Sequence, residues 1–136
     1  MKGTAMEEVT QNTATTATIL VADDDESLRE TLAEQLRIKG FTVLTAADGD
    51  QALAQALEHH PDLTVLDVVM PGKTGTEVLS AIREDAWGKN AKVVMASNVS
   101  STDVYNQALE SGANDFYSKS EVSLEDMVNF ISERVA

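Results

Sequence analysis

The sequence contains no cysteine, which excludes disulfide bonds and thiolate metal sites. Basic residues are also scarce, because ten lysines and arginines stand against 23 aspartates and glutamates and leave a net charge of −13. Nucleic acid and anionic membranes repel such a chain, so we expect neither as a direct partner. Most of these carboxylates need no role beyond keeping the surface soluble.

Long apolar runs are missing as well. None approaches the roughly 20 residues that a membrane-spanning helix needs, and the N-terminus lacks the basic and apolar segments of a secretory signal. We therefore expect a cytoplasmic protein, which the absence of cysteine fits. Residues 1–17 show no apolar period and predict a flexible N-terminal tail. Residues 18–136 are enough for one domain with a hydrophobic core.

Short apolar runs alternate with helical patterns along the rest of the chain. The runs, which we expect to be strands, lie at 19–22, 41–44, 63–66, 93–96 and 115–117. The last is the weakest and predicts an edge strand. The segments between them space apolar residues by three and four, as amphipathic helices do. This alternation predicts an α/β fold with a doubly wound five-stranded parallel sheet, order 2-1-3-4-5, and helices on both faces.

Polar residues stand where four of these strands end. Asp23 and Asp24 follow the first strand, and Asp67 follows the third. Ser97 ends the fourth strand, and Lys119 follows the fifth. In a sheet of this order, the carboxyl ends of these strands lie side by side. Taken singly, each residue is more simply a helix cap or a solvated loop residue, but polar residues at four strand ends on one edge favour a shared site.

The chemistry of such a site follows from its residue types. Clustered carboxylates repel one another, so either their pKa values rise or a cation lies among them. Neither histidine nor cysteine stands at these strand ends, and carboxylate oxygens are ligands that Mg²⁺ prefers. A carboxylate nucleophile with Mg²⁺, a hydroxyl and a lysine suits phosphoryl transfer, since the cations neutralise charge on the transferring group.

Four segments of the chain resemble the receiver domain of bacterial response regulators in two-component systems. They are ILVADDDE at 19–26, PDLTVLDVVMPG at 61–72, VVMAS at 93–97 and GANDFYSK at 112–119. The resemblance, which is to chemotaxis-type single-domain receivers, implies a flavodoxin-like fold. It also implies a signalling phosphoprotein that receives its phosphoryl group from a sensor histidine kinase or a phosphotransfer protein. Such a domain catalyses only its own phosphorylation and dephosphorylation and is not otherwise an enzyme.

The same resemblance implies the parts of a phosphoacceptor site. Asp67 would accept the phosphoryl group as an aspartyl phosphate and would also bind Mg²⁺. Asp24 would bind the metal directly, and Asp23 would bind it through water. The backbone carbonyl of Val69 would supply a further metal ligand.

The remaining implied roles belong to the switch. Lys119 would pair with one phosphoryl oxygen, and Ser97 would hydrogen-bond another and move when it appears. Phe116 would then turn inward as the aromatic switch residue, although it also fits as an ordinary core aromatic. These movements would change the surface of the fourth helix, fifth strand and fifth helix that an unknown downstream protein recognises.

Several residues depart from the family pattern. Ser120 stands where a proline, often preceded by a cis bond, is usual. A cis bond before a residue other than proline costs about 2.5–4 kcal/mol, so we do not assume one here.

The other departures lie around the phosphoryl site and the switch. Asn98 replaces a small residue and could crowd the phosphoryl site, and Phe116 lacks the hydroxyl of a tyrosine. Val69 and Val99 stand where polar residues are common, so we expect Val69 not to position an attacking water and the acyl phosphate to be long-lived.

Several functions fit the sequence. The first is a free-standing signal carrier, either a monomer or a weak phosphorylation-dependent dimer. The second is the receiver portion of a longer response regulator or hybrid kinase. A dehalogenase-like phosphatase would use Asp23 and Asp25 but would leave Asp67 without a role. A flavodoxin-like electron carrier conflicts with the three aspartates that occupy the place of a phosphate-binding loop.

Overall fold

The computed structural model describes residues 16–98 and 101–135, and the structural statements below concern these ranges. Most of the predicted tail at 1–17 lies outside them and stays a prediction, and Val99 lies outside them too. None of the described helices is long and apolar enough to cross a membrane.

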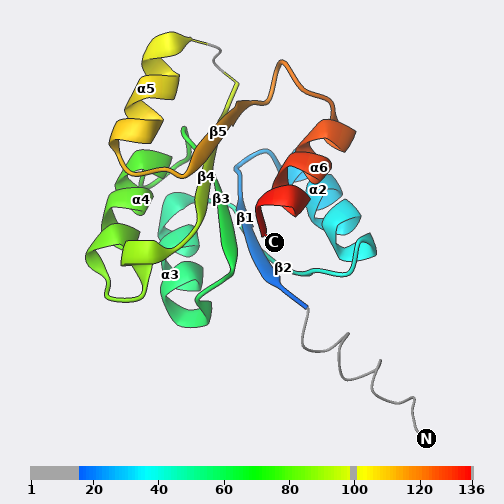
Figure 1. Ribbon diagram of the computed structural model, residues 1–136, viewed down its shortest axis with the longest axis horizontal. Coiled ribbons are helices and arrows are strands. Elements are labelled where there is room, and N and C mark those ends of the chain that lie inside the picture. The colour runs from blue at the N-terminus through cyan, green and yellow to red at the C-terminus, as the bar shows by residue number, and fades with distance from the viewer. Residues whose placement is uncertain (1–15, 99–100, 136) are drawn as a thin grey trace, which may run out of the picture.

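Five parallel strands form one sheet in the order β2-β1-β3-β4-β5, as the sequence predicts (Figure 1). The second strand differs from the predicted 41–44, because its backbone stays paired with β1 two residues further, as far as the Ala22–Ala46 pair. Both β2 and β5 lie at edges of the sheet. The strands are β1 (Thr18–Ala22), β2 (Thr42–Ala46), β3 (Leu63–Asp67), β4 (Val93–Ser97) and β5 (Asp115–Ser118).

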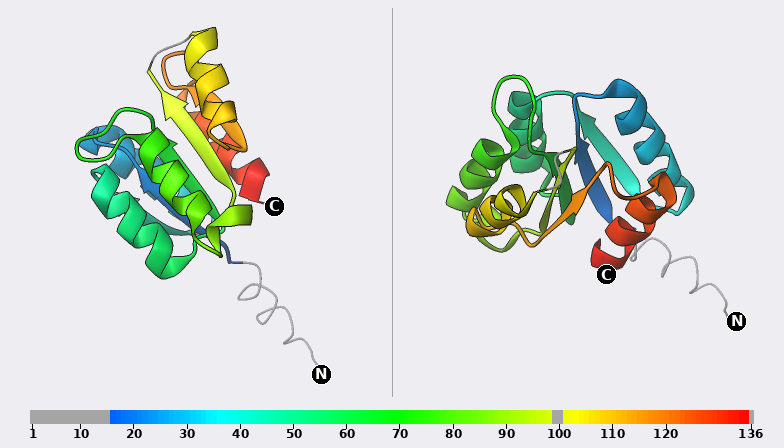
Figure 2. Two further views of the ribbon diagram at one scale, coloured as in Figure 1. Left: turned by 90° about the vertical axis from the view of Figure 1, so that its left-hand side faces the viewer. Right: turned by 90° about the horizontal axis from the view of Figure 1, so that it is seen from above.

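Helices cover both faces of the sheet (Figure 2). Side chains alternate between the faces along each strand. Ile19 of β1 therefore joins a core with α2 and α6, whereas Leu20 joins a second core with α3, α4 and α5. Both cores are built mainly from aliphatic side chains, so the sheet is a rigid support for its loops. The helices are α2 (Glu26–Ile38), α3 (Gly49–His59), α4 (Gly75–Glu84), α5 (Thr102–Glu110) and α6 (Leu124–Val135), with a short 3₁₀ turn, η1 (Gly88–Asn90).

The start of α4 fixes the loop that follows β3. The backbone N–H of Gly75 donates to the carbonyl of Val68 at 2.9 Å. A Cβ atom at Gly75 would collide with the carbonyl oxygen of Asp67, so only glycine permits this close approach. Thr74 and Glu77 form a capping box that holds the first turn of α4. The end of β3 is thereby held in one position.

Candidate functional site

Three aspartates meet at the carboxyl edge of the sheet. Asp67 is the last residue of β3, and Asp23 and Asp24 directly follow the neighbouring strand β1. Each offers a carboxylate oxygen, and these oxygens lie within 4.8 Å of one another. Asp23 and Asp67 are each only 6% exposed, whereas Asp24 is exposed to solvent. The convergence predicted from the strand order is therefore present.

Lys119 joins two of these carboxylates from the loop after β5. Its Nζ lies 2.8 Å from Oδ2 of Asp23 and 3.2 Å from Oδ2 of Asp67. The Lys119 side chain is only 4% exposed. Its backbone N–H donates to the carbonyl of Ser97 at 2.7 Å, which ties this loop to the end of β4. One ammonium group thus serves two buried carboxylates.

The pKa values of Asp67 and Lys119 reflect the presence of one ammonium group beside two buried carboxylates. Burial raises the pKa of Asp67, and the negative charge of Asp23 raises it further. Lys119 and a hydrogen bond from the Val69 backbone lower this pKa only in part, and the result is about 6. Burial alone lowers the pKa of Lys119, but its hydrogen bond to Asp23 and the charge of Asp67 together raise it above the ordinary value.

Asp23 is held in place by its surroundings. Its Oδ1 accepts from the backbone N–H of Asp25 at 2.9 Å, and Arg29 donates to its backbone carbonyl at 3.0 Å. Asp25 itself caps α2 by accepting from the N–H of Leu28. Asp25 therefore has the capping role that the sequence suggested, and among the described residues it is not one of the three clustered aspartates.

Ser97 stands at the end of β4 and is 2% exposed. Its strand β4 lies between β3, which ends at Asp67, and β5, which Lys119 follows, because Ala96 pairs with Asp67 and Ser97 pairs with Ser118. The N-cap of α5 is Ser101 rather than Ser97. A capping role therefore does not explain Ser97, and its place beside the aspartates fits the predicted site.

Phe116 and Val69 lie at the margins of the cluster. Phe116, in β5, is half-buried and contacts Tyr105 of α5 edge-on, with ring centroids 5.8 Å apart. The Val69 side chain, two residues after Asp67, is 68% exposed. Both positions could be predicted from the sequence, but Tyr105 could not, because its spacing on the helix gives no sign of this contact.

Ser120 replaces the usual proline and makes a contact that the sequence did not reveal. Its hydroxyl donates to the backbone carbonyl of Asn98 at 3.2 Å and lies 3.1 Å from the hydroxyl of Ser118. Within the described ranges no peptide bond is cis, so the Lys119–Ser120 bond is trans. Ser120 thus joins the loops that follow β4 and β5.

A sequence profile of the response regulator receiver domain matches residues 19–132. The chain belongs to this family. PrrA of Mycobacterium tuberculosis, a transcriptional regulatory protein, is 41% identical over 105 residues, which cover 77% of this receiver chain and 44% of PrrA. MtrA of Mycolicibacterium smegmatis, a DNA-binding response regulator, is 41% identical over 101 residues, 74% of this chain and 43% of MtrA. This receiver chain therefore spans less than half the length of these relatives.

Solved receiver structures share the fold. The chemotaxis response regulator CheY4 of Vibrio cholerae superposes with a TM-score of 0.81 at 31% identity. The superposition covers 90% of this chain and 100% of the CheY4 chain. The putative response regulator of Chloroflexus aurantiacus gives a TM-score of 0.80 at 28% identity, over 88% of this chain and 98% of its own. The predicted flavodoxin-like receiver fold is confirmed.

Proposed function

We propose that this receiver domain is a phosphorylation-controlled signalling switch whose phosphoacceptor is Asp67. The observation that carries the proposal is the buried Asp67 carboxylate, which shares Lys119 with Asp23 at the carboxyl edge of the sheet. The donor would be a sensor histidine kinase or a phosphotransfer protein of the two-component type. We propose that residues 18–136 form the receiver domain.

The chain's own residues supply the parts of the transfer. A carboxylate oxygen of Asp67 forms the new bond to phosphorus, while the N–P bond of the donor phosphohistidine breaks and the imidazole nitrogen takes up a proton. Lys119 neutralises charge on the phosphoryl oxygens, and the hydroxyl of Ser97 donates a hydrogen bond to one of them. Asp67 and Ser97 end strands of the sheet, and Lys119 is held by its contacts with Asp23 and Asp67, so the site is largely assembled before transfer.

The aspartate cluster fits Mg²⁺. Its ligands are hard carboxylate oxygens, and the two buried carboxylates share a single ammonium group. Asp23, Asp24, Asp67 and the backbone carbonyl of Val69 would hold the ion. When bound, Mg²⁺ neutralises charge on the transferring phosphoryl group.

Intact-mass spectrometry after incubation with Mg²⁺ and a small-molecule phosphoryl donor tests the acceptor. We expect one labile phosphoryl adduct on the wild-type chain and none on Asp67→Asn. The matched control is Asp25→Asn, which alters the neighbouring capping carboxylate and should keep the adduct. An adduct that persisted in Asp67→Asn would exclude Asp67 as the acceptor. Catalytic turnover of a generic phosphomonoester would instead favour the dehalogenase-like phosphatase.

The output would be a population shift between two arrangements of the switch residues. The phosphoryl group favours the arrangement in which Ser97 approaches it and Phe116 turns inward. In the described structure Phe116 instead packs against Tyr105 of α5, so this movement would break an existing contact. The changed surface of α5, β5 and α6 is then recognised by a downstream protein.

The comparisons support two alternatives for the protein in which the switch acts. The whole-domain match to CheY4 supports a free-standing carrier, which would act in the cytoplasm as a monomer or a weak phosphorylation-dependent dimer. The greater length of PrrA and MtrA supports the receiver portion of a longer response regulator. In that second setting, any contact with DNA would come from another domain, because this acidic domain repels polyanions.

The exposed valine at position 69 leads to a prediction about the phosphoryl lifetime. An apolar side chain cannot hold an attacking water, so the wild-type aspartyl phosphate should be long-lived. Val69→Asn offers hydrogen bonds at the same place and should speed loss of the phosphoryl group roughly tenfold. The decay of the mass adduct over time measures this rate. Val69→Leu, which stays apolar, is the control, and equal decay in all three chains would refute the idea.

A further inference from the structure

Asp23 has a partner at each of its polar atoms. Its backbone N–H donates to the carbonyl of Ala46 at 3.1 Å. Its carboxylate accepts hydrogen bonds from the backbone N–H of Asp25 and from Nζ of Lys119. Its carbonyl oxygen accepts from Nη1 of Arg29 at 3.0 Å. Among these partners, Arg29 is the side chain whose role in the site the proposed function leaves open.

Arg29 is itself held in one position. Its side chain is only 13% exposed, and its Nε donates to the carboxylate of Glu30 at 3.1 Å. Its backbone N–H donates to the carbonyl of Asp25, the N-cap of α2, at 2.9 Å. Further along, α2 is anchored in the core by Leu32 and Leu36. The guanidinium group therefore reaches back from the start of a packed helix to the residue that follows β1.

The carbonyl that Arg29 holds belongs to the peptide group that leads into Asp24. A peptide group is planar, so a bond that fixes its oxygen also fixes the direction in which the next residue leaves it. Asp24 is exposed, so its backbone places its carboxylate more than packing does. That carboxylate still belongs to the cluster whose oxygens lie within 4.8 Å of one another. Arg29 thus controls the position of the exposed carboxylate of the proposed metal site.

We infer that Arg29 is a positioning residue for Mg²⁺, which acts through the Asp23–Asp24 peptide group and not through its charge. This role rests on the proposed function, because it takes the aspartate cluster as the Mg²⁺ site. By charge alone, a guanidinium group beside the cluster would repel a cation and weaken its binding. Glu30 offsets the charge of Arg29 at 3.1 Å, so the effect on position prevails. Residues that orient metal ligands contribute roughly 10- to 100-fold to metal affinity.

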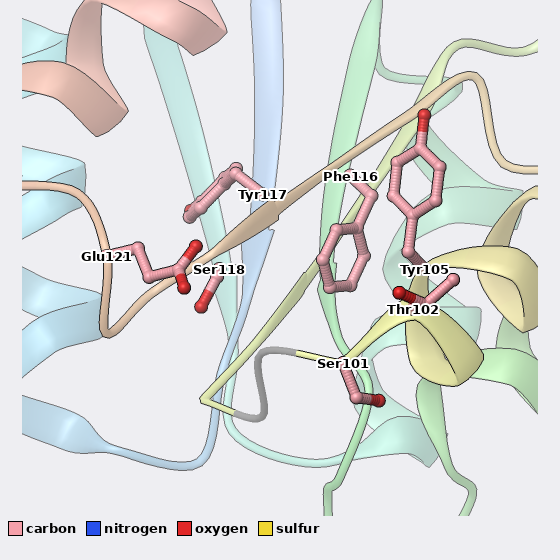
Figure 3. A pocket seen from close by; sticks show the side chains of 7 residues that line it. All are labelled: Ser101, Thr102, Tyr105, Phe116, Tyr117, Ser118 and Glu121. Atoms are coloured by element: carbon pink, nitrogen blue, oxygen red, sulfur yellow. The ribbon is translucent and has the colours of Figure 1, made fainter.

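Arg29 lies away from the proposed switch surface. Figure 3 shows the cavity of about 390 Å³ beside Phe116, which is lined by residues between Ser101 and Glu121. The helix that carries Arg29, α2, packs on the opposite face of the sheet from α5 (Figure 2). Substitutions of Arg29 therefore leave the walls of this cavity unchanged. A change of cation binding in such variants would come from the aspartate cluster.

Isothermal titration calorimetry with Mg²⁺, without a phosphoryl donor, tests the role of Arg29. Arg29→Met removes the hydrogen bond and the charge together, so positioning and charge predict opposite results. We expect Arg29→Met to bind Mg²⁺ about tenfold more weakly than the wild type. Arg29→Lys keeps an N–H donor on a long side chain and should recover most of the lost affinity. Binding by Arg29→Met as tight as that of the wild type, or tighter, would overturn the inference.

Arg37→Met is the matched control. Arg37 lies on the same helix, and its Nη2 donates to the backbone carbonyl of Val43 at 2.9 Å. The control therefore loses the same kind of bond and the same charge. Val43 pairs with Ile19, near the opposite end of β1 from Asp23, so we expect Arg37→Met to keep its Mg²⁺ affinity. Equal losses of affinity in Arg29→Met and Arg37→Met would mean a general effect of helix packing and would contradict the role of Arg29.

Two measurements separate this role from a folding defect and from a failure of the proposed function. Urea denaturation in chelator reports whether each variant is folded. If Arg29→Met does not fold, Arg29→Gln, whose side chain is too short to reach the carbonyl, carries the same expectation. Mass spectrometry of the wild type with Mg²⁺ and the phosphoryl donor is the second measurement. Mg²⁺ binding that depends on Arg29, in a chain that takes up no phosphoryl group, would support the inference and contradict the proposed phosphoacceptor alone. A wild-type chain that binds no Mg²⁺ would overturn both the metal site and the role of Arg29.

Discussion

Replacing Asp67 with asparagine should make the fold more stable when no divalent cation is present. Asp67 is buried beside Asp23, and burial and that neighbouring charge raise its pKa to about 6. Asparagine has nearly the same shape but no charge, so Lys119 would then face one carboxylate instead of two. We expect the free energy of unfolding at neutral pH to rise by on the order of 2 kcal/mol.

Urea denaturation in the presence of a chelator measures this gain. Asp103→Asn is the control, because it makes the same chemical change at an exposed position in the first turn of α5 and should alter stability by less than about 0.5 kcal/mol. Adding Mg²⁺ should stabilise the wild type more than Asp67→Asn, since the ion has one carboxylate fewer to bind in the variant. A stability loss in Asp67→Asn would show that the carboxylate contributes more to the fold than its burial costs.

The fold was predictable because its pattern is local. Each strand is a short apolar run and each helix a stripe of residues three and four apart, and right-handed connections leave few alternatives for their order. The end of β2 was less predictable. Thr45 and Ala46 belong to the strand through pairing with β1, and a threonine beside an alanine shows no continuous apolar run.

The position of the site was predictable for a related reason. Parallel strands end on one edge, so Asp23, Asp67 and Ser97 had to lie close together once the strand order was known. The contacts among side chains were not predictable. That Lys119 bridges two carboxylates, and that Tyr105 packs on Phe116, depends on side-chain conformations and on segments far apart in the sequence.

The departures from the family pattern illustrate the same limit. Ser120 could be recognised from the sequence as an unusual residue, and its trans bond agrees with the cost of a cis bond before a residue other than proline. The hydrogen bond from the Ser120 hydroxyl to the carbonyl of Asn98 could not be predicted from the sequence. It depends on how closely the loops after β4 and β5 approach each other. The loop that carries Asn98 is therefore tied to the loop of Lys119 at two points, through Ser97 and through Ser120.

Removing the ammonium group of Lys119 should have the largest effect on stability. Lys119→Met fills most of the same volume but leaves Asp23 and Asp67 buried side by side without their shared cation. Breaking a buried ion pair in this way commonly costs 3–5 kcal/mol. Asp67 can relieve part of the repulsion by taking up a proton, since its pKa is already about 6. We therefore expect a loss of about 3 kcal/mol in chelator, measured by urea denaturation.

A double-mutant cycle shows whether this loss comes from the paired carboxylates. If it does, Asp67→Asn should recover much of the stability in the Lys119→Met background and gain more there than in the wild type, because it removes one of two uncompensated charges. Lys89→Met, at an exposed position of η1, is the control and should change stability little. Strictly additive effects of the two substitutions would mean that Lys119 stabilises the fold by packing alone. Strong coupling would show that charge balance among Asp23, Asp67 and Lys119 governs the stability of the site.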